Sequence, residues 1–313
     1  MCTAVRFNDR FFGRTFDFES SFGEEMVITP RGRMRVGQAE NRYAFMGVGL
    51  KNEGTPLYFD GVNEWGLVAC ALNFPYFATY HDDAYAKAAV SASHLISLML
   101  GFSHSVAEVR EMLKNIAITN ESPNKKYKVT PLHWIVSDPR ESLVVESVQG
   151  GLRVYDNPVG VLTNSPELPY HLTRLADYSS LSTRNPKNTQ GLLYSRGMGA
   201  IGLPGDFSSS SRFIRASFLK QNCPINPDST TGGLGQAFDI LASVSLPYGA
   251  VITDEGLPMH TRYTAVIDME SPAYYLTTST CRAISRIKLT DSLCEAAEIT
   301  TAPIYKEQII CDL

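Results

Sequence analysis

The stretch Cys2-Thr3-Ala4-Val5-Arg6-Phe7, directly after Met1, is an apolar run that places a cysteine second in the chain. Methionine aminopeptidase removes an initiator methionine when the next residue is small, so the mature chain would begin with a cysteine that carries a free α-amine and a thiol. Such groups titrate within about two units of neutral pH, and N-terminal residues activated by their own amine are a known class of nucleophile. The alternative is that Cys2 begins an ordinary buried strand.

The next stretch, residues 11–19, predicts a second strand that runs antiparallel to the first after a turn at Asn8-Asp9-Arg10. It is aromatic apart from a few residues, and Arg14 and Asp17 place charges inside it. A cation beside Cys2 would favour the thiolate, and Asp17 could accept a hydrogen bond from the mature N-terminal amine and orient it. Charges in such a strand need a reason, and a site around Cys2 supplies one.

The composition is that of a globular protein with a large core: 313 residues, 44% of them hydrophobic and 19% charged. The net charge of −4 and the lack of a Lys/Arg cluster argue against binding to nucleic acid or to an anionic membrane. No apolar run reaches the length of about 18 residues that a membrane span needs, and the first residues lack the pattern of a signal peptide. We therefore expect a small molecule as the partner, and neither nucleic acid nor a membrane.

The cysteines are scattered singly, with no CxxC pair and no Cys/His cluster of the zinc type. This pattern predicts reduced, mostly buried thiols in a cytoplasmic protein, with no metal or other cofactor. The six positions are Cys2, Cys70, Cys223, Cys281, Cys294 and Cys311.

Apolar runs bounded by turn residues alternate in blocks with helical patterns. Strands are predicted at residues 26–29, 43–48, 67–72, 132–136, 142–148, 152–155, 261–268 and 273–278, and helices at residues 85–100, 106–116, 212–221 and 234–246. The three strands from residue 132 to residue 155 form a meander, Gly101 would end the first helix, and Ser105-x-x-Glu108 is a capping box for the second. This order fits an α+β fold of two antiparallel sheets packed face to face and covered by helices. No repeat or linker divides the chain, so we expect a single domain over residues 2–313.

Several polar residues are candidates for a site. We interpret His94 and His104 as structural or exposed, and His133 as packed or on the surface, because the N-terminal amine already fills the role of a base. The Gly-rich stretch at residues 197–205 lacks the Lys-Ser/Thr of a phosphate loop, which argues against nucleotide binding. Arg212 stands in the first turn of a helix, where the macrodipole opposes a cation, so we expect a site to hold it.

Four separated stretches, taken together and in order, form a specific pattern. They are Cys2 with Gly13-Arg14-x-x-Asp17; Ala71-Leu72-Asn73-Phe74-Pro75; Gly160-Val161-Leu162-Thr163-Asn164-Ser165-Pro166; and Gly202-Leu203-Pro204-Gly205-Asp206-Phe207 with Ser211-Arg212-Phe213-Ile214-Arg215. This pattern resembles the choloylglycine hydrolase family, whose members are bile salt hydrolases and penicillin V acylases, and further similarity extends over most of the chain. The implied fold is the four-layer αββα sandwich of the N-terminal nucleophile hydrolases.

The resemblance implies a role for each matching residue. An amide would be cleaved through a thioester on the cysteine, and hydrogen-bond donors aimed at the oxyanion would lower the barrier. By position, three aromatic residues are candidates to line an apolar pocket that would suit a steroid. The implied set is Cys2 as nucleophile with its amine as base, Arg14 and Asp17 as flanking charges, Asn73 and Asn164 near the oxyanion, Arg212 behind the nucleophile, and Phe16, Phe22 and Phe59 in the pocket.

Asn73 divides the family. Bile salt hydrolases resemble this chain in having Asn at that position, whereas penicillin V acylases typically have Tyr, so glycine- and taurine-conjugated bile salts are the expected substrates. Two departures affect the fit of the acyl group: the loop at residues 119–128 is more polar than the family's pocket loop, and Phe16 replaces a smaller or flexible residue. The alternatives are a penicillin V or N-acyl-homoserine-lactone acylase and an inactive bile-acid-binding relative. The resemblance also implies a homotetramer.

Overall fold

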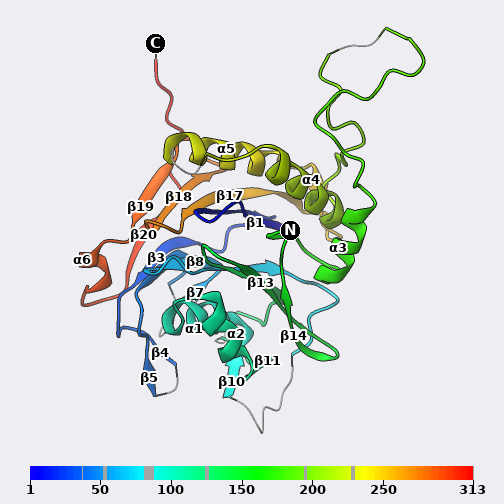
Figure 1. The fold of residues 1–313 in the computed structure, drawn as a ribbon. Coiled ribbons are helices and arrows are strands. Elements are labelled where there is room, and N and C mark those ends of the chain that lie inside the picture. Colours follow the sequence, from blue (N-terminus) through cyan, green and yellow to red (C-terminus); the bar gives the residue numbers. More distant parts are fainter. Residues whose placement is uncertain are drawn as a thin grey trace.

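Two antiparallel sheets lie face to face, and the N-terminal strand belongs to the first of them (Figure 1). The computed structural model describes residues 1–36, 38–51, 55–80, 88–123, 127–193, 196–226 and 230–312. The strands of the first sheet are, in order across it, β15 (Val161–Leu162), β1 (Cys2–Arg6), β2 (Phe11–Phe18), β17 (Pro258–Asp268), β18 (Ala273–Thr278) and β19 (Ser285–Lys288), with β16 (Val251–Ile252) paired to β17.

The second sheet carries the strands that face the first one across the core. Its order is β14 (Gly151–Asp156), β13 (Ser142–Val148), β12 (Leu132–Ser137), β9 (Val68–Asn73), β8 (Asp60–Asn63), β6 (Phe45–Leu50), β3 (Glu25–Thr29) and β20 (Thr300–Pro303), with β7 (Leu57–Tyr58) paired to β6. Two small pairs stand apart: β4 (Arg35–Val36) with β5 (Ala39–Glu40), and β10 (Ala88–Ser91) with β11 (Ile116–Thr119).

Helices cover the outer face of each sheet, which gives the αββα layering that the sequence implied (Figure 1). On the first sheet lie α4 (Ser209–Asn222) and α5 (Thr230–Ala242), with α3 (Leu168–Ala176) beside α4. On the second sheet lie α1 (Leu95–Phe102) and α2 (Val106–Leu113), and the short α6 (Asp291–Cys294) follows β19. Within the described residues, no helix is both long and apolar enough to span a bilayer.

The β1–β2 hairpin forms because its turn is closed by a side chain. Asn8 Oδ1 accepts hydrogen bonds from the backbone nitrogens of Arg10 (3.0 Å) and Phe11 (2.8 Å), an arrangement typical of Asn in turns. The resulting register sets Cys2 opposite Phe16. The turn therefore fixes which residues of β2 lie beside the N-terminal cysteine.

Gly13 allows α5 to approach the first sheet closely. A Cβ atom at this position would lie 2.7 Å from Leu241 Cδ1 of α5 and 3.0 Å from the backbone oxygen of Ala265 in β17. Only a residue without a side chain fits there. The glycine beside Arg14 is thus explained by packing.

The strands of the second sheet alternate between two hydrophobic clusters. On β12, Ile135 joins the cluster between the sheets, which also contains Cys2 and Cys70, whereas Trp134 and Val136 pack toward α1 and α2. This alternation follows from the two-residue period of a strand. The sheets are therefore buried on both faces along most of their strands.

The helix predicted at residues 85–100 is wrong over part of its length. Residues 81–87 lie outside the described chain, and Ala88–Ser91 form a strand that pairs in parallel with β11. The pairing with a distant strand outweighs the helical preference of the alanines. Gly101 lies inside α1 and does not end it. A Cβ at this position would lie 3.0 Å from Asn41 Cβ, so close packing explains the glycine.

The other helices differ from prediction at their ends. Half of the expected capping box is present: Ser105 Oγ accepts a hydrogen bond from Glu108 N, but the Glu108 carboxylate accepts from His104 N and not from Ser105 N. Helix α2 ends at Leu113, and Ile116 begins β11. Helix α5 begins at Thr230, before the predicted start. Helix α3 was not predicted; Pro169 in its first turn was the signal for its start.

Candidate active site

Cys2 stands at the start of β1, almost fully buried, and borders a cavity. Its backbone nitrogen donates a hydrogen bond to Asn164 Oδ1 at 2.9 Å. Met1 precedes it and pairs with the backbone of Asp17 through two hydrogen bonds, of 2.7 and 3.0 Å. Removal of Met1 would turn the Cys2 nitrogen into the α-amine, and that atom is already held in place.

The side-chain amide of Asn164 joins three parts of the site. Its Oδ1 accepts from the Cys2 nitrogen and from Arg212 Nη2 (2.7 Å), and its Nδ2 donates to the backbone oxygen of Asn73 at 2.7 Å. Asn73 is the last residue of β9, so the amide links the two sheets. The side-chain oxygen of Asn73 is buried and has no hydrogen-bond partner in the described part of the chain.

Arg212, in the first turn of α4, is completely buried behind Cys2. It donates to the Cys2 backbone oxygen (2.5 Å), Thr3 Oγ1 (2.7 Å), Asn164 Oδ1 (2.7 Å) and the Phe207 backbone oxygen (2.9 Å). No carboxylate of the described residues lies within ion-pair distance of it. Burial lowers the pKa of its guanidinium, although Asp17 and Cys2 oppose this shift.

Arg14 is also completely buried, but it has a carboxylate partner that the sequence did not reveal. Arg14 Nη1 lies 2.8 Å from Asp60 Oδ2. The same carboxylate accepts hydrogen bonds from the hydroxyls of Tyr263 and Tyr274, both at 2.6 Å. Arg14 therefore belongs to a charge-balanced cluster between the sheets, and its Cζ lies 4.9 Å from the ring centroid of Phe16.

Asp17 lies two residues beyond Thr15 on β2, and its carboxylate is held by hydroxyls. Thr261 Oγ1 donates to Oδ1 at 2.6 Å and Thr15 Oγ1 donates to Oδ2 at 3.2 Å. Only the backbone of Asp17 contacts Met1 directly. Its charge nevertheless acts on the Met1 α-amine and offsets part of the lowering of the pKa of that amine.

The terminal amine titrates below its ordinary range in this environment. Burial is the main cause of the lowered pKa of the Met1 α-amine; Cys2 and Asp17 oppose the shift, and Arg212 adds to it. A lower pKa means that more of the amine is neutral near pH 7. Since the Cys2 nitrogen lies one residue further in among the same groups, an α-amine there would meet the same causes.

A cavity of about 310 Å³ opens beside Cys2 and is walled mainly by apolar side chains. All three predicted pocket residues border it, and their rings contact each other: Phe16 is stacked on Phe59 with centroids 4.9 Å apart and meets Phe22 edge-on at 6.4 Å. The wall consists of Cys2, Phe16, Phe18, Phe22, Leu50, Leu57, Tyr58, Phe59, Ala71, Asn73, Ala92, Ser93, Pro123, Tyr127, Lys128, Thr130, Leu132 and Trp134.

The family resemblance pointed to a further part of this wall. The polar loop predicted at residues 119–128, in the place of the family's pocket loop, contributes Pro123, Tyr127 and Lys128, while its residues 124–126 lie outside the described chain. Asp60 and the two tyrosines that bond to it were missed, because they lie far from Arg14 in the sequence. An Asp directly after an aromatic residue in an apolar stretch was the only available signal for Asp60.

The arrangement can perform acyl transfer from an amide. A thiol at the wall of an apolar cavity has a nitrogen of its own residue as a prospective base, two side-chain amides nearby, and a buried cation behind its backbone. These are the parts that an acyl-enzyme mechanism needs: a nucleophile, a base and donors for an oxyanion. The family that the chain matches has the same chemistry.

A model of the linear amide C–N hydrolases of the choloylglycine hydrolase family matches residues 2–302. The chain belongs to this family. The match begins at Cys2 and covers both sheets and all the helices described above. The protein is thus an amide C–N hydrolase of the N-terminal nucleophile fold, with a cysteine at the nucleophile position.

Members of the choloylglycine hydrolase family resemble the chain over almost its full length. It is 37% identical to the bile salt hydrolase/transferase of Lactiplantibacillus plantarum, over 98% of each chain. The structure of a mutant conjugated bile acid hydrolase from Clostridium perfringens superposes with a TM-score of 0.92 at 31% identity, over 100% of both chains. A penicillin V acylase from Agrobacterium tumefaciens shares the fold, with a TM-score of 0.75 at 22% identity, over 96% of this chain and 90% of its own.

Proposed function

We propose that the protein hydrolyses the amide bond of glycine- and taurine-conjugated bile salts. The observation that carries the proposal is the position of Cys2 at the wall of a cavity of about 310 Å³ lined by aromatic rings. This volume is in the usual range for small-molecule sites, about 300–1,000 Å³. The family relatives named as bile salt hydrolases support the same substrate class.

In the proposed first step, the Cys2 thiolate attacks the carbonyl carbon of the amide. The Cys2 α-amine, after Met1 has been removed, takes the thiol proton, and its nitrogen is oriented by Asn164 Oδ1. Burial lowers the pKa of the Met1 α-amine, and burial of an α-amine on Cys2 would favour the neutral form that this role requires. Asp17 sits close enough to balance the ammonium once it has formed.

The negative charge then moves to the carbonyl oxygen, and donors stabilise it. Asn164 Nδ2 carries two hydrogens and uses one of them for the Asn73 backbone oxygen, so the other is free for the oxyanion. The Asn73 side chain borders the cavity and supplies the second amide. Arg212 and Arg14 are the flanking cations that favour the thiolate.

The tetrahedral intermediate collapses when the C–N bond breaks. The Cys2 ammonium gives its proton to the departing nitrogen, which leaves as glycine or taurine, and the acyl group remains as a thioester on the sulfur. Water, deprotonated by the same amine, attacks the thioester and releases the free bile acid and the thiolate. No step needs a metal or another cofactor.

The steroid part occupies the aromatic cavity in this proposal. Phe16, Phe22 and Phe59 form one wall, and apolar burial there supplies most of the binding free energy. Asn73 favours bile salts over penicillin V, because family members that cleave penicillin V typically carry Tyr at this position. Lys128, on another part of the wall, could contact a polar group of the acyl part.

We further propose that residues 2–313 form one domain that assembles as a homotetramer in the cytoplasm. The arm between α3 and α4 extends away from the body of the molecule (Figure 1). It carries Leu192 and Leu193, which are 66% and 104% exposed. Burial of these leucines in an assembly would remove an apolar surface from water, and the six cysteines, all free, suit a reducing compartment.

Release of glycine and taurine from glycocholate and taurocholate, measured beside hydrolysis of penicillin V, tests the substrate. Intact mass reports whether Met1 has been removed, and the Cys2→Ala protein is the control. We expect release from both bile salts that is lost in the control. Cleavage of penicillin V alone would refute the substrate, and bile-acid binding without turnover by a chain that lacks Met1 would refute the enzyme. A monomer mass from light scattering would refute the tetramer.

A further inference from the structure

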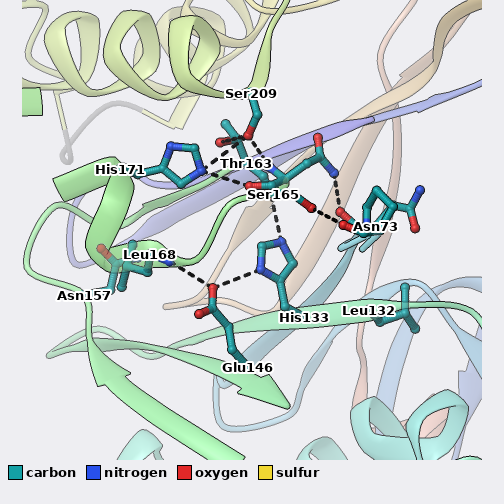
Figure 2. A network of polar contacts seen from close by, with 12 residues as sticks. Asn73, Leu132, His133, Glu146, Asn157, Thr163, Ser165, Leu168, His171 and Ser209 are labelled. Atoms are coloured by element: carbon teal, nitrogen blue, oxygen red, sulfur yellow. Dashed lines mark hydrogen bonds and ion pairs between the residues drawn. The ribbon is translucent and has the colours of Figure 1, made fainter. Parts of the chain in front are cut away.

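A buried pair of titratable side chains, His133 and Glu146, lies on strands β12 and β13, near Thr163 and Leu168 (Figure 2). His133 Nδ1 lies 3.2 Å from Glu146 Oε1, and both side chains have zero solvent exposure. The imidazole is stacked on Phe74, with ring centroids 4.2 Å apart. The mechanism described above uses neither residue.

The hydrogen bonds of the pair require one shared proton. His133 Nε2 lies 2.9 Å from the Thr163 backbone oxygen, and a carbonyl can only accept, so Nε2 is the donor. Glu146 Oε1 also accepts from the Leu168 backbone nitrogen at 3.1 Å. The contact between Nδ1 and Oε1 therefore needs a proton on one of the two atoms. This proton joins the two side chains into one hydrogen-bonded unit.

This unit clamps the turn that carries Asn164. His133 holds its start at Thr163, and Glu146 holds its end at Leu168, the first residue of α3 (Figure 2). Between them, Ser209 Oγ accepts from Asn164 N and His171 Nε2 donates to Asn164 O, both at 2.9 Å. The backbone of Asn164 is thus fixed on each side, and from this position its amide reaches Cys2 N, Arg212 and the Asn73 backbone oxygen.

Stability alone does not explain the pair. Buried ion pairs are commonly no better for folding than apolar side chains of similar size, because the charges lose their hydration. Moreover, Glu146 Oε2 is buried without a hydrogen-bond partner among the described residues. Two apolar residues would fill this space without an unpaired oxygen, but they could not hold Thr163 and Leu168.

We propose that His133 and Glu146 are positioning residues for the amide hydrolysis. They set the backbone of Asn164, whose Oδ1 then lies 2.9 Å from the Cys2 nitrogen. The inference rests on the proposed function only for the choice of substrate. Its consequence is that loosening the pair lowers turnover and the reactivity of Cys2 while leaving the cavity, and hence substrate binding, unchanged.

The test uses variants that remove the contacts of the pair step by step. Glu146→Gln keeps the shape and, with its amide oxygen in the place of Oε1, the acceptor for Leu168 N, but it loses the shared proton with His133 Nδ1, because both contacts are made by this one atom. Glu146→Leu removes both contacts, and the double variant His133→Phe/Glu146→Leu also leaves no unpaired charge. Ser137→Ala is the matched control, since it removes a buried hydroxyl pair of 2.9 Å with Ser142 from the same two strands.

The measurements are kcat and KM for taurocholate, the rate at which iodoacetamide alkylates Cys2, followed by peptide mass, and the unfolding midpoint. We expect kcat to fall about tenfold or more in Glu146→Leu and in the double variant, with KM within about twofold. The alkylation rate falls with kcat. Glu146→Gln, which keeps one of the two contacts, lowers kcat less than Glu146→Leu does, and Ser137→Ala lowers only the unfolding midpoint.

Wild-type kcat and alkylation rates in folded Glu146→Leu and in the double variant would overturn the proposal, and so would a larger loss of kcat in Glu146→Gln than in Glu146→Leu, because the Gln variant keeps the acceptor for Leu168 N. If both leucine variants fail to fold, His133→Phe, which keeps the stack on Phe74, decides by the same criteria. Alkylation needs no bile salt. If the wild type leaves taurocholate intact, the proposed substrate fails, and the alkylation rates still decide the positioning role.

Discussion

The two buried arginines of the site have the same exposure and opposite surroundings. Arg14 lies between the sheets and is paired with Asp60, whose carboxylate also accepts two tyrosine hydroxyls. Arg212 lies between the first sheet and α4, and only carbonyl, hydroxyl and amide oxygens accept its hydrogen bonds. One arginine thus belongs to a neutral cluster, whereas the other is a buried charge without a counter-ion among the described residues.

The difference indicates what each arginine contributes. A pair of opposite charges at 2.8 Å has a field that decays quickly with distance, so Asp60 offsets much of the effect of Arg14 on Cys2. The field of Arg212 is not offset in this way, and it acts on Cys2 and on the terminal amine. We therefore expect Arg14 to matter most for stability and Arg212 most for the chemistry of the thiolate.

The largest effect is expected from Arg14→Leu, which leaves Asp60 as an unpaired buried carboxylate. The free energy of unfolding should fall by about 3–5 kcal/mol, as measured by urea denaturation. Arg14→Leu/Asp60→Asn, which removes both charges, should recover part of this loss. Arg35→Leu breaks an exposed pair with Glu40 and should cost less than about 1 kcal/mol; an equal loss in both single variants would contradict the comparison.

Arg212→Leu comes next and should act mainly on catalysis. Loss of the buried charge and of its bonds to Cys2 and Asn164 should lower kcat/KM for the proposed substrate by about 10²–10³-fold, the size seen when an oxyanion donor is removed. Arg215→Leu is the control, one turn further along α4, where the guanidinium bonds to backbone oxygens away from Cys2. Similar losses of kcat/KM in both folded variants would mean that Arg212 acts only through α4.

A smaller effect on the free energy of unfolding is expected when one tyrosine hydrogen bond is removed, and it should be larger for a carboxylate acceptor than for a hydroxyl acceptor. Tyr274→Phe removes a hydrogen bond of 2.6 Å to the Asp60 carboxylate and should lower the free energy of unfolding by about 1.5–2 kcal/mol. Tyr58→Phe removes a buried bond of 2.7 Å to the Thr29 hydroxyl and should cost about 0.5–1 kcal/mol. Denaturation of both variants side by side measures the difference, and a larger loss in Tyr58→Phe would argue against a charged Asp60.

The smallest effect concerns the start of α4, which carries Arg212. Hydrogen bonds from Ser208 and Ser211 lower the pKa of Asp206 from 3.8 to about 2. The stability that Asp206 adds relative to Asp206→Asn is therefore present above about pH 4 and disappears as the pH falls through about 2. Because Asp206 is exposed, we expect less than about 1 kcal/mol, measured by urea denaturation at about pH 5 and about pH 2; a difference that grows on acidification would contradict this.

Local sequence features predicted that Arg212 is held by a site, but they did not predict the partner of Arg14. A cation in the first turn of a helix is unfavourable, and this alone indicated that Arg212 is held by other groups. The same kind of reasoning identified the β1–β2 turn, the meander of β12, β13 and β14, and Ser105 as the N-terminal cap of α2, all of which are present. Each of these features depends on residues that are close in the sequence.

The errors have the opposite origin. The strand β10 was assigned to a helix because its pairing partner, β11, begins 28 residues further along the chain. Asp60 was missed because it lies 46 residues from Arg14, and His133 looked like a packed or surface residue because Glu146 and Thr163 were not visible as its partners. Periodicity describes the neighbours along one element, and says nothing of which distant side chain lies across the core.

The sequence by itself determined the nucleophile candidate, the layered α+β architecture and the residues that match the family, because these depend on residue type and short spacing. Tertiary structure alone decided which charges are compensated: Asp60 for Arg14, none of the described carboxylates for Arg212, and Glu146 for His133. Electrostatic interactions between buried groups depend on distance in space and on burial. Both are set when the two sheets pack together, and neither can be read from the order of the residues.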